Sequence, residues 1–581
     1  MNRRTLLRAA VAASAGVVAG PAILRGLPAV AAASLPFVAD YKSNVTANLT
    51  VDTNAAVRIL SGMQRVWRTG TSWDNGTVLD AATLHASMRY ATKVTRARTQ
   101  AQADRAFVQD RQHQSYAAIA GLGALAAPYK AIAKAVTSIT TAPASTPATK
   151  IDDAVPAGAP AGSALGAGAV DSPLGQVVTL VNTVRGPYAS GNPSKAAYQY
   201  PRPWRMNADS KVVDTGAVDA LGYPVYDSPV SVVPTLLRQR STTPADDGGF
   251  PSGHTNAFHL AALAFAYAVP ERFQQLVTAA FDLSDTRIVA GMHSPADVIG
   301  GRILATALAA ATLADPANAA LKAAARRQAL DVLLTSTPAG PDAYADRRAN
   351  RRIVEPRLTY GLPRTGRPNV PMVVPQGAEV LLETLFPYLT AAQRREVLRT
   401  TAVPSGYPLL DGPELWGRLD LFTAADGYGA FDSDVTVTMD VAGTWRNDIT
   451  GRGGLVKRGT GTLTLTGATT YRGGTVLREG TLVAASLGTG DVTVTGGTLQ
   501  TTGELHVRGD YEQRGGTLTG RLAVDGHAAL GGTLALTPGG PATVVTARRV
   551  TGRFAHVTAP DGYRADVTYG RTKVTARLRR A

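Results

Sequence analysis

The strongest constraint on the fold is a short repeat in the last part of the chain. The tripeptide Gly-Thr-Leu begins at five positions that lie 16 to 19 residues apart, namely Gly461, Gly480, Gly497, Gly516 and Gly532. Threonine, valine and leucine alternate around each copy, which is typical of short β-strands. Because a repeated turn-and-strand unit buries its inner face only against its neighbours, the pattern predicts an all-β solenoid over residues 430–581. A β-sandwich with similarly spaced turns is the alternative.

Residues 34–425 have a different composition and are predicted to form an all-α helical bundle. Apolar residues recur at helical spacing over 57–66, and long Ala/Leu stretches occupy 257–268 and 303–313. Since neither stretch reaches the roughly 20 apolar residues of a membrane span, we expect buried helices and no transmembrane span. A stretch rich in Ala, Pro, Gly, Ser and Thr at about 140–175 predicts a flexible loop. The expected protein is therefore multidomain.

Residues 1–33 have the features of an export signal. The pair Arg3-Arg4 precedes two leucines, a run of Ala, Val and Gly follows over 9–22, and small residues at 29–33 offer cleavage sites. This order is similar to a twin-arginine (Tat) signal peptide, so we expect a secreted or cell-surface protein that is exported by the twin-arginine pathway. A basic amphipathic helix at the start of the chain is the alternative.

Composition excludes several kinds of chemistry. The chain has no cysteine, which excludes disulfide scaffolds, thiolate zinc sites and cysteine nucleophiles. Its formal net charge of +16 favours anionic partners. Such partners include phosphorylated substrates and anionic cell-surface polymers, and a polymer of this kind is a candidate ligand of the arginine-rich solenoid. We expect no nucleic-acid partner. Those arginines have a simpler interpretation, which is a solvated surface.

The first motif that carries chemistry is Phe-Pro-Ser-Gly-His-Thr at 250–255. Ser252 is a good N-cap for the apolar helix that follows. The free N–H groups of Gly253 and His254 would then face out of the helix start, where anions bind. His254 at this position is a candidate general acid. The alternative is a capped helix with an incidental histidine.

The second motif is Thr286-Arg287, followed by His293 and Asp297. Asp297 is at position i+4 from His293, so on a helix the two side chains would share a face. A carboxylate beside an imidazole sets its tautomer and leaves the other ring nitrogen free to attack. Arg287 can offer a bidentate fork to phosphate. A surface His–Asp pair and a metal site are the alternatives, although a metal would need more ligands than this cluster supplies.

A third segment, residues 195–203, places Lys195 and Arg202 around an aromatic stretch. Taken together, the three segments read Lys-x6-Arg-Pro, Pro-Ser-Gly-His and Thr-Arg-x5-His-x3-Asp. This pattern resembles the signature of the type 2 phosphatidic acid phosphatase superfamily, which includes secreted class A acid phosphatases and vanadium haloperoxidases. The resemblance covers 195–297 and departs at Thr286, where the family usually has serine, with the hydroxyl retained.

The resemblance implies a fold and a mechanism. The fold is the helical domain of that superfamily, and the activity is metal-independent hydrolysis of phosphomonoesters through a phosphohistidine. His293 would attack phosphorus, Asp297 would orient His293, and His254 would protonate the leaving group. No cofactor is implied for a phosphatase, and vanadate would inhibit it. The phosphate-binding residues that the resemblance implies are Lys195, Arg202, Ser252, Gly253 and Arg287.

Two other functions remain open. The same pocket holding vanadate as a cofactor would be a haloperoxidase. A non-catalytic surface protein that binds through its solenoid is the second alternative, although such a protein would have no use for the histidines and cations above. Residues 453–467 and 470–475 resemble the autotransporter-associated β-strand repeat, which supports the solenoid. Autotransporters continue into a membrane barrel, whereas this sequence ends at Ala581, so the resemblance does not imply self-secretion.

Overall fold

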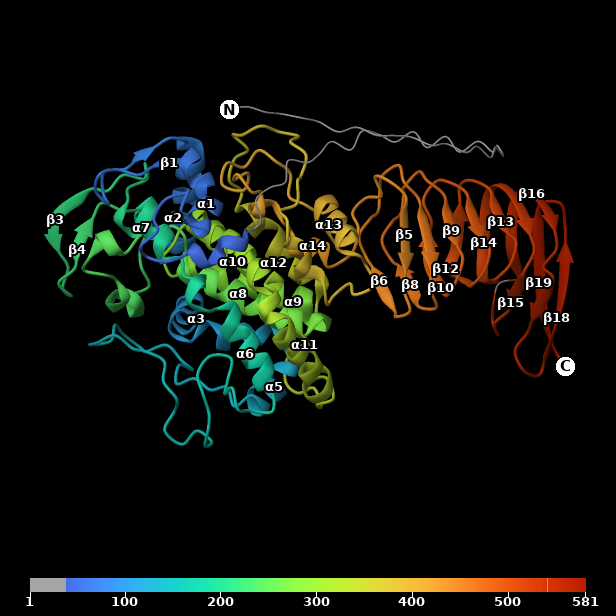
Figure 1. Cartoon of the computed structure of the whole chain (residues 1–581), viewed down its shortest axis with the longest axis horizontal. Helices are drawn as coiled ribbons and strands as arrows, with labels where there is room; N and C mark the ends of the chain where they lie inside the picture. Colours follow the sequence, from blue (N-terminus) through green and yellow to red (C-terminus); the bar gives the residue numbers. More distant parts are fainter. Residues whose placement is uncertain (1–37, 541) are drawn as a thin grey trace, which may run out of the picture. The chain divides into compact units, whose positions relative to one another are not determined.

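The computed structural model describes residues 38–540 and 542–581 (Figure 1). The predicted export signal at 1–33 lies outside the described residues. The described chain has a helical region followed by a parallel β-solenoid, which confirms the predicted fold class.

Helices dominate the described chain up to Ala424. The α-helices are α1 (Ala55–Ile59), α2 (Ala81–Ala97), α3 (Gln100–Arg111), α4 (Gln114–Ala118), α5 (Ala126–Ile132), α6 (Gly175–Val184), α7 (Asn192–Tyr198), α8 (Gly253–Ala268), α9 (Phe273–Val289), α10 (Pro295–Ala314), α11 (Ala319–Gln328), α12 (Arg347–Thr359), α13 (Ala391–Thr400) and α14 (Leu421–Ala424). Two small antiparallel hairpins, which the sequence analysis did not predict, pair β1 (Trp67–Arg68) with β2 (Thr77–Val78) and β3 (Asp214–Val218) with β4 (Pro224–Tyr226).

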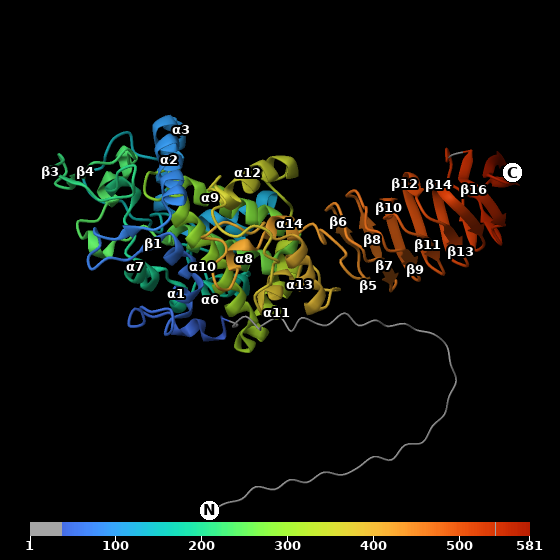
Figure 2. The same ribbon diagram turned by 90° about the horizontal axis from the view of Figure 1, so that it is seen from above.

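Helices α8, α9 and α10 form the centre of the helical part, and Figures 1 and 2 show α8 and α10 surrounded by the other helices. Nearly every residue of these three helices is buried. The Ala/Leu-rich sequences of α8 and α10 are apolar on nearly all sides, as expected of core helices, whereas α9 also buries polar residues such as Gln274 and Arg287. Among the described residues, α10 alone is long and apolar enough to cross a membrane, and the whole of that apolar stretch is buried inside the protein. A buried core helix has the same composition.

Two glycines bring the start of α8 against the start of α10. A Cβ atom on Gly300 would lie 2.3 Å from the ring of Phe250, and one on Gly301 would lie 2.6 Å from the carbonyl oxygen of Ser252. No other residue allows such close backbone approach. The backbone N–H of Ser252 donates to the carbonyl oxygen of Asp297 at 2.8 Å, so the N-terminal ends of both helices converge on one point.

The segment at 140–174 contains no helix or strand in the described structure. Its acidic residues tie it to the end of α3: Arg111 donates to Asp152 at 2.6 Å, and the backbone N–H of His113 donates to Asp153 at 2.9 Å. These contacts hold the segment against the helical core.

Short strands follow from Val435 onward, and Figures 1 and 2 show them stacked in a row. They are β5 (Val435–Thr438), β6 (Gly443–Trp445), β7 (Leu455–Arg458), β8 (Thr462–Leu465), β9 (Thr475–Leu477), β10 (Thr481–Ser486), β11 (Val492–Val494), β12 (Thr498–Val507), β13 (Tyr511–Gln513), β14 (Thr517–Leu530), β15 (Thr533–Ala535), β16 (Thr543–Gly552), β17 (His556–Thr558), β18 (Tyr563–Tyr569) and β19 (Lys573–Arg580).

The strands pair in parallel in two rows, one running β5-β7-β9-β11-β13 and the other β6-β8-β10-β12, and both rows join at β14. Parallel pairing of successive rungs is the solenoid that the repeat predicts, and it is incompatible with the antiparallel β-sandwich alternative. The last pairs, β16 with β19 and β18 with β19, are antiparallel.

The Gly-Thr-Leu repeat has a direct structural explanation. Its leucines lie opposite one another in successive strands and point inward, each with an exposed fraction of 0%: Leu463, Leu482, Leu499, Leu518 and Leu534. Four of the preceding glycines have φ between 57° and 71°, the left-handed region that favours glycine: Gly480, Gly497, Gly516 and Gly532. Each copy of the repeat therefore supplies a glycine for the turn and a leucine that points into the core of its rung.

The helical part and the solenoid share one continuous hydrophobic core. Trp445 is fully buried, its ring lies 5.1 Å from that of Tyr428, and its indole N–H donates to the hydroxyl of Tyr388 at 3.1 Å. Asp426 pairs with Arg347 of α12 and accepts from Gln274 of α9. The first rung of the solenoid thus packs on the helices.

Candidate active site

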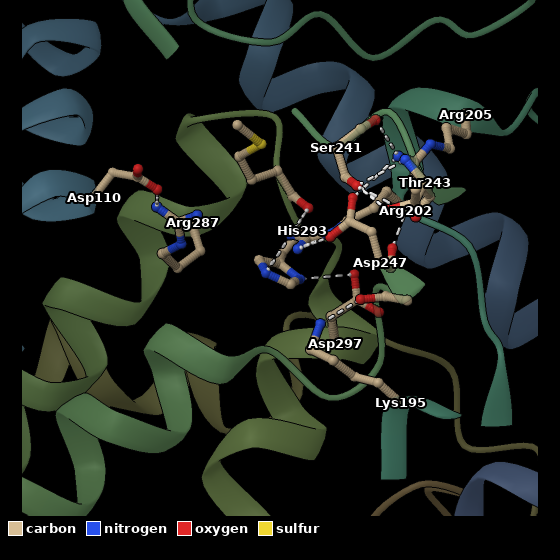
Figure 3. Close-up of polar contacts among 12 residues, drawn as sticks. Asp110, Lys195, Arg202, Arg205, Ser241, Thr243, Asp247, Arg287, His293 and Asp297 are labelled. Carbon is tan, nitrogen blue, oxygen red and sulfur yellow. Dashed lines mark hydrogen bonds and ion pairs between the residues drawn. The ribbon is translucent and has the colours of Figure 1, made fainter. Parts of the chain in front are cut away.

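The three motifs found in the sequence converge where α8 and α10 begin. Figure 3 shows two of them together, the segment with Lys195 and Arg202 and the motif with His293. Lys195 comes from α7, Arg202 directly precedes a 3₁₀ turn at Pro203–Arg205, and Arg287 lies in the last turn of α9. The charges of Lys195, Arg202 and Arg287 all act on the imidazole of His293. Segments far apart in the sequence therefore form one electrostatic cluster.

His293 and Asp297 form a buried pair, with Nδ1 of the imidazole 3.5 Å from Oδ2 of the carboxylate. Their exposed fractions are 1% and 0%. The expectation that both lie on one helix is wrong in detail, because Pro295 starts α10 and His293 precedes it. Proline suits the first position of a helix, where no N–H is needed. Asp297 instead reaches back from the first turn, and its Oδ2 accepts from the N–H of Ser294 at 2.8 Å.

The position of Arg202 sets the tautomer of His293. Its Nη1 lies 2.8 Å from Nε2 of the imidazole. A guanidinium can only donate, so Nε2 accepts, and the proton of a neutral imidazole lies on Nδ1, which faces Asp297. Burial, followed by the charge of Arg202, holds the pKa of His293 well below its usual value, and burial raises the pKa of Asp297 to about 6. His293 is therefore neutral, with its reactive lone pair on Nε2.

Lys195 and Arg202 are both held by the loop that precedes α8. The Lys195 ammonium donates to the carbonyl oxygen of Gly248, and burial lowers its pKa to about 7. Arg202 donates from Nε and Nη2 to Oδ1 of Asp247, at 3.0 and 2.5 Å. Asp247 also pairs with the buried Arg205, at 3.1 Å. The cations are thus ordered before any ligand arrives.

The end of α3 supplies a residue that the sequence analysis missed. Asp110 pairs with Arg287, and its backbone carbonyl oxygen lies 2.9 Å from Nε2 of His254. Burial alone would raise the pKa of Asp110, but the positive charges led by Arg287 lower it to about 2. Burial, followed by the charge of Arg287, lowers the pKa of His254 to about 3. His254 is therefore neutral until an anion enters the site, because negative charge nearby favours its protonated form.

The start of α8 is open to a ligand. Ser252 caps the helix, as the sequence predicts, with its hydroxyl oxygen accepting from the N–H of Thr255 at 3.4 Å. In the described part of the chain, the N–H groups of Gly253 and His254 donate to no protein acceptor. A Cβ atom built on Gly253 would meet nothing within 4 Å. Free N–H groups beside open space at a helix start favour an anion.

Figure 3 shows the arrangement of the predicted site residues that surround His293. His293 lies centrally, Asp297 and Lys195 lie below it, Arg202 lies on one side and Arg287 on the other, turned toward Asp110. Thr286, where serine was expected, is buried, and its hydroxyl donates to the carbonyl oxygen of Leu283 at 2.6 Å.

Three functional neighbours were missed: Asp110, Arg205 and Asp247. Asp247 stands five residues before Ser252, and this short spacing could have drawn attention to it. Asp110 is 144 residues from His254, and nothing in the local sequence around it indicates a link. Within residues 38–540 and 542–581, no group of three or more His, Cys, Asp or Glu side chains is placed to hold a metal ion.

Comparison with known proteins agrees with this geometry. Residues 176–320 match the PAP2 superfamily, and residues 455–484 match the passenger-associated transport repeat. The chain is 37% identical over 68 residues to the non-specific acid phosphatase of Salmonella typhi, covering 12% of this chain and 27% of that protein. The acid phosphatase of Salmonella typhimurium is 36% identical over 76 residues, which is 12% of this chain and 30% of the relative.

The solenoid part has a different relative. The neisserial autotransporter lipoprotein NalP of Neisseria meningitidis serogroup B is 37% identical over 84 residues, covering 14% of this chain and 8% of that protein. The chain spans less than a third of the length of each of these relatives. The chain therefore contains a PAP2 superfamily domain and an autotransporter-type repeat, as their resemblance in the sequence indicated.

Proposed function

We propose that this protein is a secreted, metal-independent phosphatase that hydrolyses small phosphomonoesters through a phosphohistidine at His293. The observation that carries the proposal is the imidazole of His293, which is buried and neutral, with Asp297 facing Nδ1 and cations around Nε2. The PAP2 match and the likeness to acid phosphatases support phosphatase activity.

The proposed reaction has two displacements at phosphorus. In the first, Nε2 of His293 attacks, the phosphorus–ester oxygen bond breaks, and protonated His254 gives its proton to the leaving oxygen. In the second, His254 takes a proton from water, the water oxygen attacks phosphorus, and the phosphorus–nitrogen bond breaks to release phosphate. This use of one group as acid and then base is general acid–base catalysis.

The cations of the site would stabilise the negative charge of the transition state. Lys195, Arg202 and Arg287, with the free N–H groups at the start of α8, would bind the phosphoryl oxygens. Charge builds on these oxygens in the transition state, and losing one such donor typically costs about 10²–10³-fold in rate. No cofactor takes part in these steps, and vanadate would occupy the same positions as an inhibitor.

A secreted or cell-surface location fits the autotransporter-type repeat and the acid phosphatase relatives. Export by the twin-arginine pathway rests on residues 1–33 alone. The anionic cell-surface polymer remains a prediction, since some solenoid arginines already have partners, such as Arg521 with Glu504 and Arg579 with Asp566.

The direct test is hydrolysis of a chromogenic aryl phosphate by the purified protein, with EDTA present. We expect turnover that survives EDTA and is blocked by vanadate. Absence of phosphate release across a broad pH range would refute the proposal. Oxidation of halide in the presence of peroxide and vanadate would then favour the haloperoxidase alternative, and failure of both assays would favour a binding role for the solenoid.

Replacing Asp110 by asparagine should reduce both stability and turnover. The variant keeps the backbone carbonyl that faces His254 but leaves the buried guanidinium of Arg287 without its charge partner. Breaking a buried ion pair lowers the free energy of unfolding by about 3–5 kcal/mol. Displacing Arg287, which is proposed to bind the phosphoryl group, should lower kcat/KM by about 10²-fold. Urea unfolding and aryl phosphate hydrolysis measure the two effects.

The matched control for this variant is Asp152→Asn. Asp152 also pairs with an arginine, Arg111, but its side chain is 79% exposed, so its loss should change neither quantity appreciably. Equal effects of the two substitutions would contradict a special role for Asp110.

A further inference from the structure

We propose that Asp247 is a specificity-determining residue, which competes with the substrate's phosphoryl group for Arg202 and so makes the site favour singly charged over doubly charged phosphate. This inference rests on the proposed function, because it concerns the phosphate site of the same reaction. It assigns a role to a carboxylate that the mechanism above does not use.

The contacts of Asp247 place a negative charge at the edge of the Arg202 guanidinium where a phosphate would bind. Oδ1 accepts from Nε and Nη2 of Arg202, which is the two-pronged edge that a guanidinium offers to carboxylate or phosphate. The exposed fractions of the Arg202 and Asp247 side chains are 16% and 17%, so this pair is the partly open side of the site. A phosphoryl group that binds Arg202 through that edge must replace Asp247 or lie directly beside it.

The side chain of Asp247 is restrained by Arg205, which contacts it on the side away from Arg202. Arg205, whose side chain is 1% exposed, contacts Oδ2 at 3.1 Å and donates to the backbone carbonyl oxygen of Asp247 at 3.2 Å. Arg205 itself is fixed, because its guanidinium stacks on the ring of Trp204 at 4.1 Å and donates to the carbonyl oxygen of Ser241. The carboxylate therefore stays near the site when Arg202 turns to a ligand.

The backbone that follows Asp247 is held as well. The carbonyl oxygen of Gly248 accepts from Lys195, and the N–H of Gly249 donates to the carbonyl oxygen of Tyr200 at 2.6 Å. A Cβ atom on Gly249 would lie 2.7 Å from the carbonyl oxygen of Pro201, so this turn packs tightly. The loop that carries Asp247 is part of the site's wall.

The charge balance around Asp247 decides what it does to a ligand. The charged groups that act with it are Arg202, Arg205 and Lys195. A phosphate monoester gains its second negative charge near pH 6, and a like charge a few ångströms away disfavours that form. Asp247 should therefore weaken binding of the dianion much more than that of the monoanion.

The test compares phosphate affinity in the wild type and in Asp247→Asn by calorimetry with inorganic phosphate, at about pH 5 and about pH 8. The substitution removes the charge and keeps the shape. At the higher pH, where wild-type Asp247 repels the second charge of phosphate, we expect the dissociation constant to be about tenfold lower in the variant than in the wild type. At the lower pH, we expect it to be lower by about threefold or less. The kcat/KM of the variant should decline less steeply with rising pH than that of the wild type.

The controls separate charge from structure. Asp246→Asn makes the same charge change one residue away, on an exposed side chain, and should leave phosphate affinity unchanged. If Asp247→Asn does not fold, Asp247→Ser provides the same charge change. Weaker phosphate binding at both pH values, or no change at either, would overturn the inference, because a residue that only orients Arg202 cannot tighten binding when it is removed.

Calorimetry measures phosphate binding without turnover, so this inference can be tested separately from the proposed function. If the wild type binds phosphate but hydrolyses no ester, the proposed phosphatase activity is refuted, and the effect of Asp247 on phosphate affinity can still be measured. A wild type that binds no phosphate at either pH would overturn both.

Discussion

Replacement of His293 by alanine is expected to reduce phosphomonoester hydrolysis by roughly 10⁴- to 10⁶-fold, the range seen when an enzyme loses its nucleophile. The reason is that Nε2 of His293 is the group proposed to form the bond to phosphorus. Steady-state hydrolysis of an aryl phosphate measures the loss. An acid-labile phosphoryl label on the protein, present in the wild type and absent from the variant, would identify the covalent step.

A second substitution, at Asp297, is expected to reduce hydrolysis less than the loss of His293 does. Asp297→Asn should retain the fold but weaken control of the imidazole tautomer, since Asp297 faces Nδ1 at 3.5 Å, and we expect a loss of about 10²–10⁴-fold. The matched control is His506→Ala, which removes a histidine paired with Asp525 at 2.7 Å on the exposed surface of the solenoid. Retained hydrolysis in His293→Ala would place the nucleophile elsewhere and refute the mechanism.

Removal of the solenoid from residue 430 onward is expected to destabilise the helical part severely. The truncation deletes Phe431 and Trp445, which are fully buried. It leaves Tyr428 without these two aromatic neighbours, and it removes the indole N–H that donates to the hydroxyl of Tyr388. Burial of one large apolar side chain is worth about 1.5–3 kcal/mol, against about 5–15 kcal/mol for the whole stability of a typical protein. Soluble yield and thermal unfolding of the truncated chain measure the effect.

A point substitution tests the same contact without removing any rung. Trp445→Ala should lower the free energy of unfolding by about 3–5 kcal/mol, because it opens a cavity between the helices and the first rung. Val441→Ala on the neighbouring turn is the control, since Val441 is 50% exposed. A truncated chain as stable as the full one would show that the helical part folds independently of the solenoid.

Much of the architecture could be predicted because it is encoded locally. Each rung of the solenoid repeats the same glycine turn and inward leucine, and the parallel register follows from that repetition. The start of α8 was predictable for the same reason, because Ser252 caps a helix through atoms three residues away. The start of α10 was predicted less well: the four-residue spacing of His293 and Asp297 suggested one helix, whereas Pro295 begins the helix between them.

The sequence by itself determined the solenoid, the helical region and the residue types of the candidate site, because spacing and composition carry that information along the chain. Only the tertiary structure decided how those residues are paired: Arg202 faces His293, Asp110 holds Arg287, and Asp247 occupies the fork of Arg202. The physical reason is that ion pairs and buried hydrogen bonds depend on which helix ends meet in space. Residues as distant as Asp110 and His254 become neighbours only because α3 packs against α9, which brings the carbonyl oxygen of Asp110 to the imidazole at the start of α8.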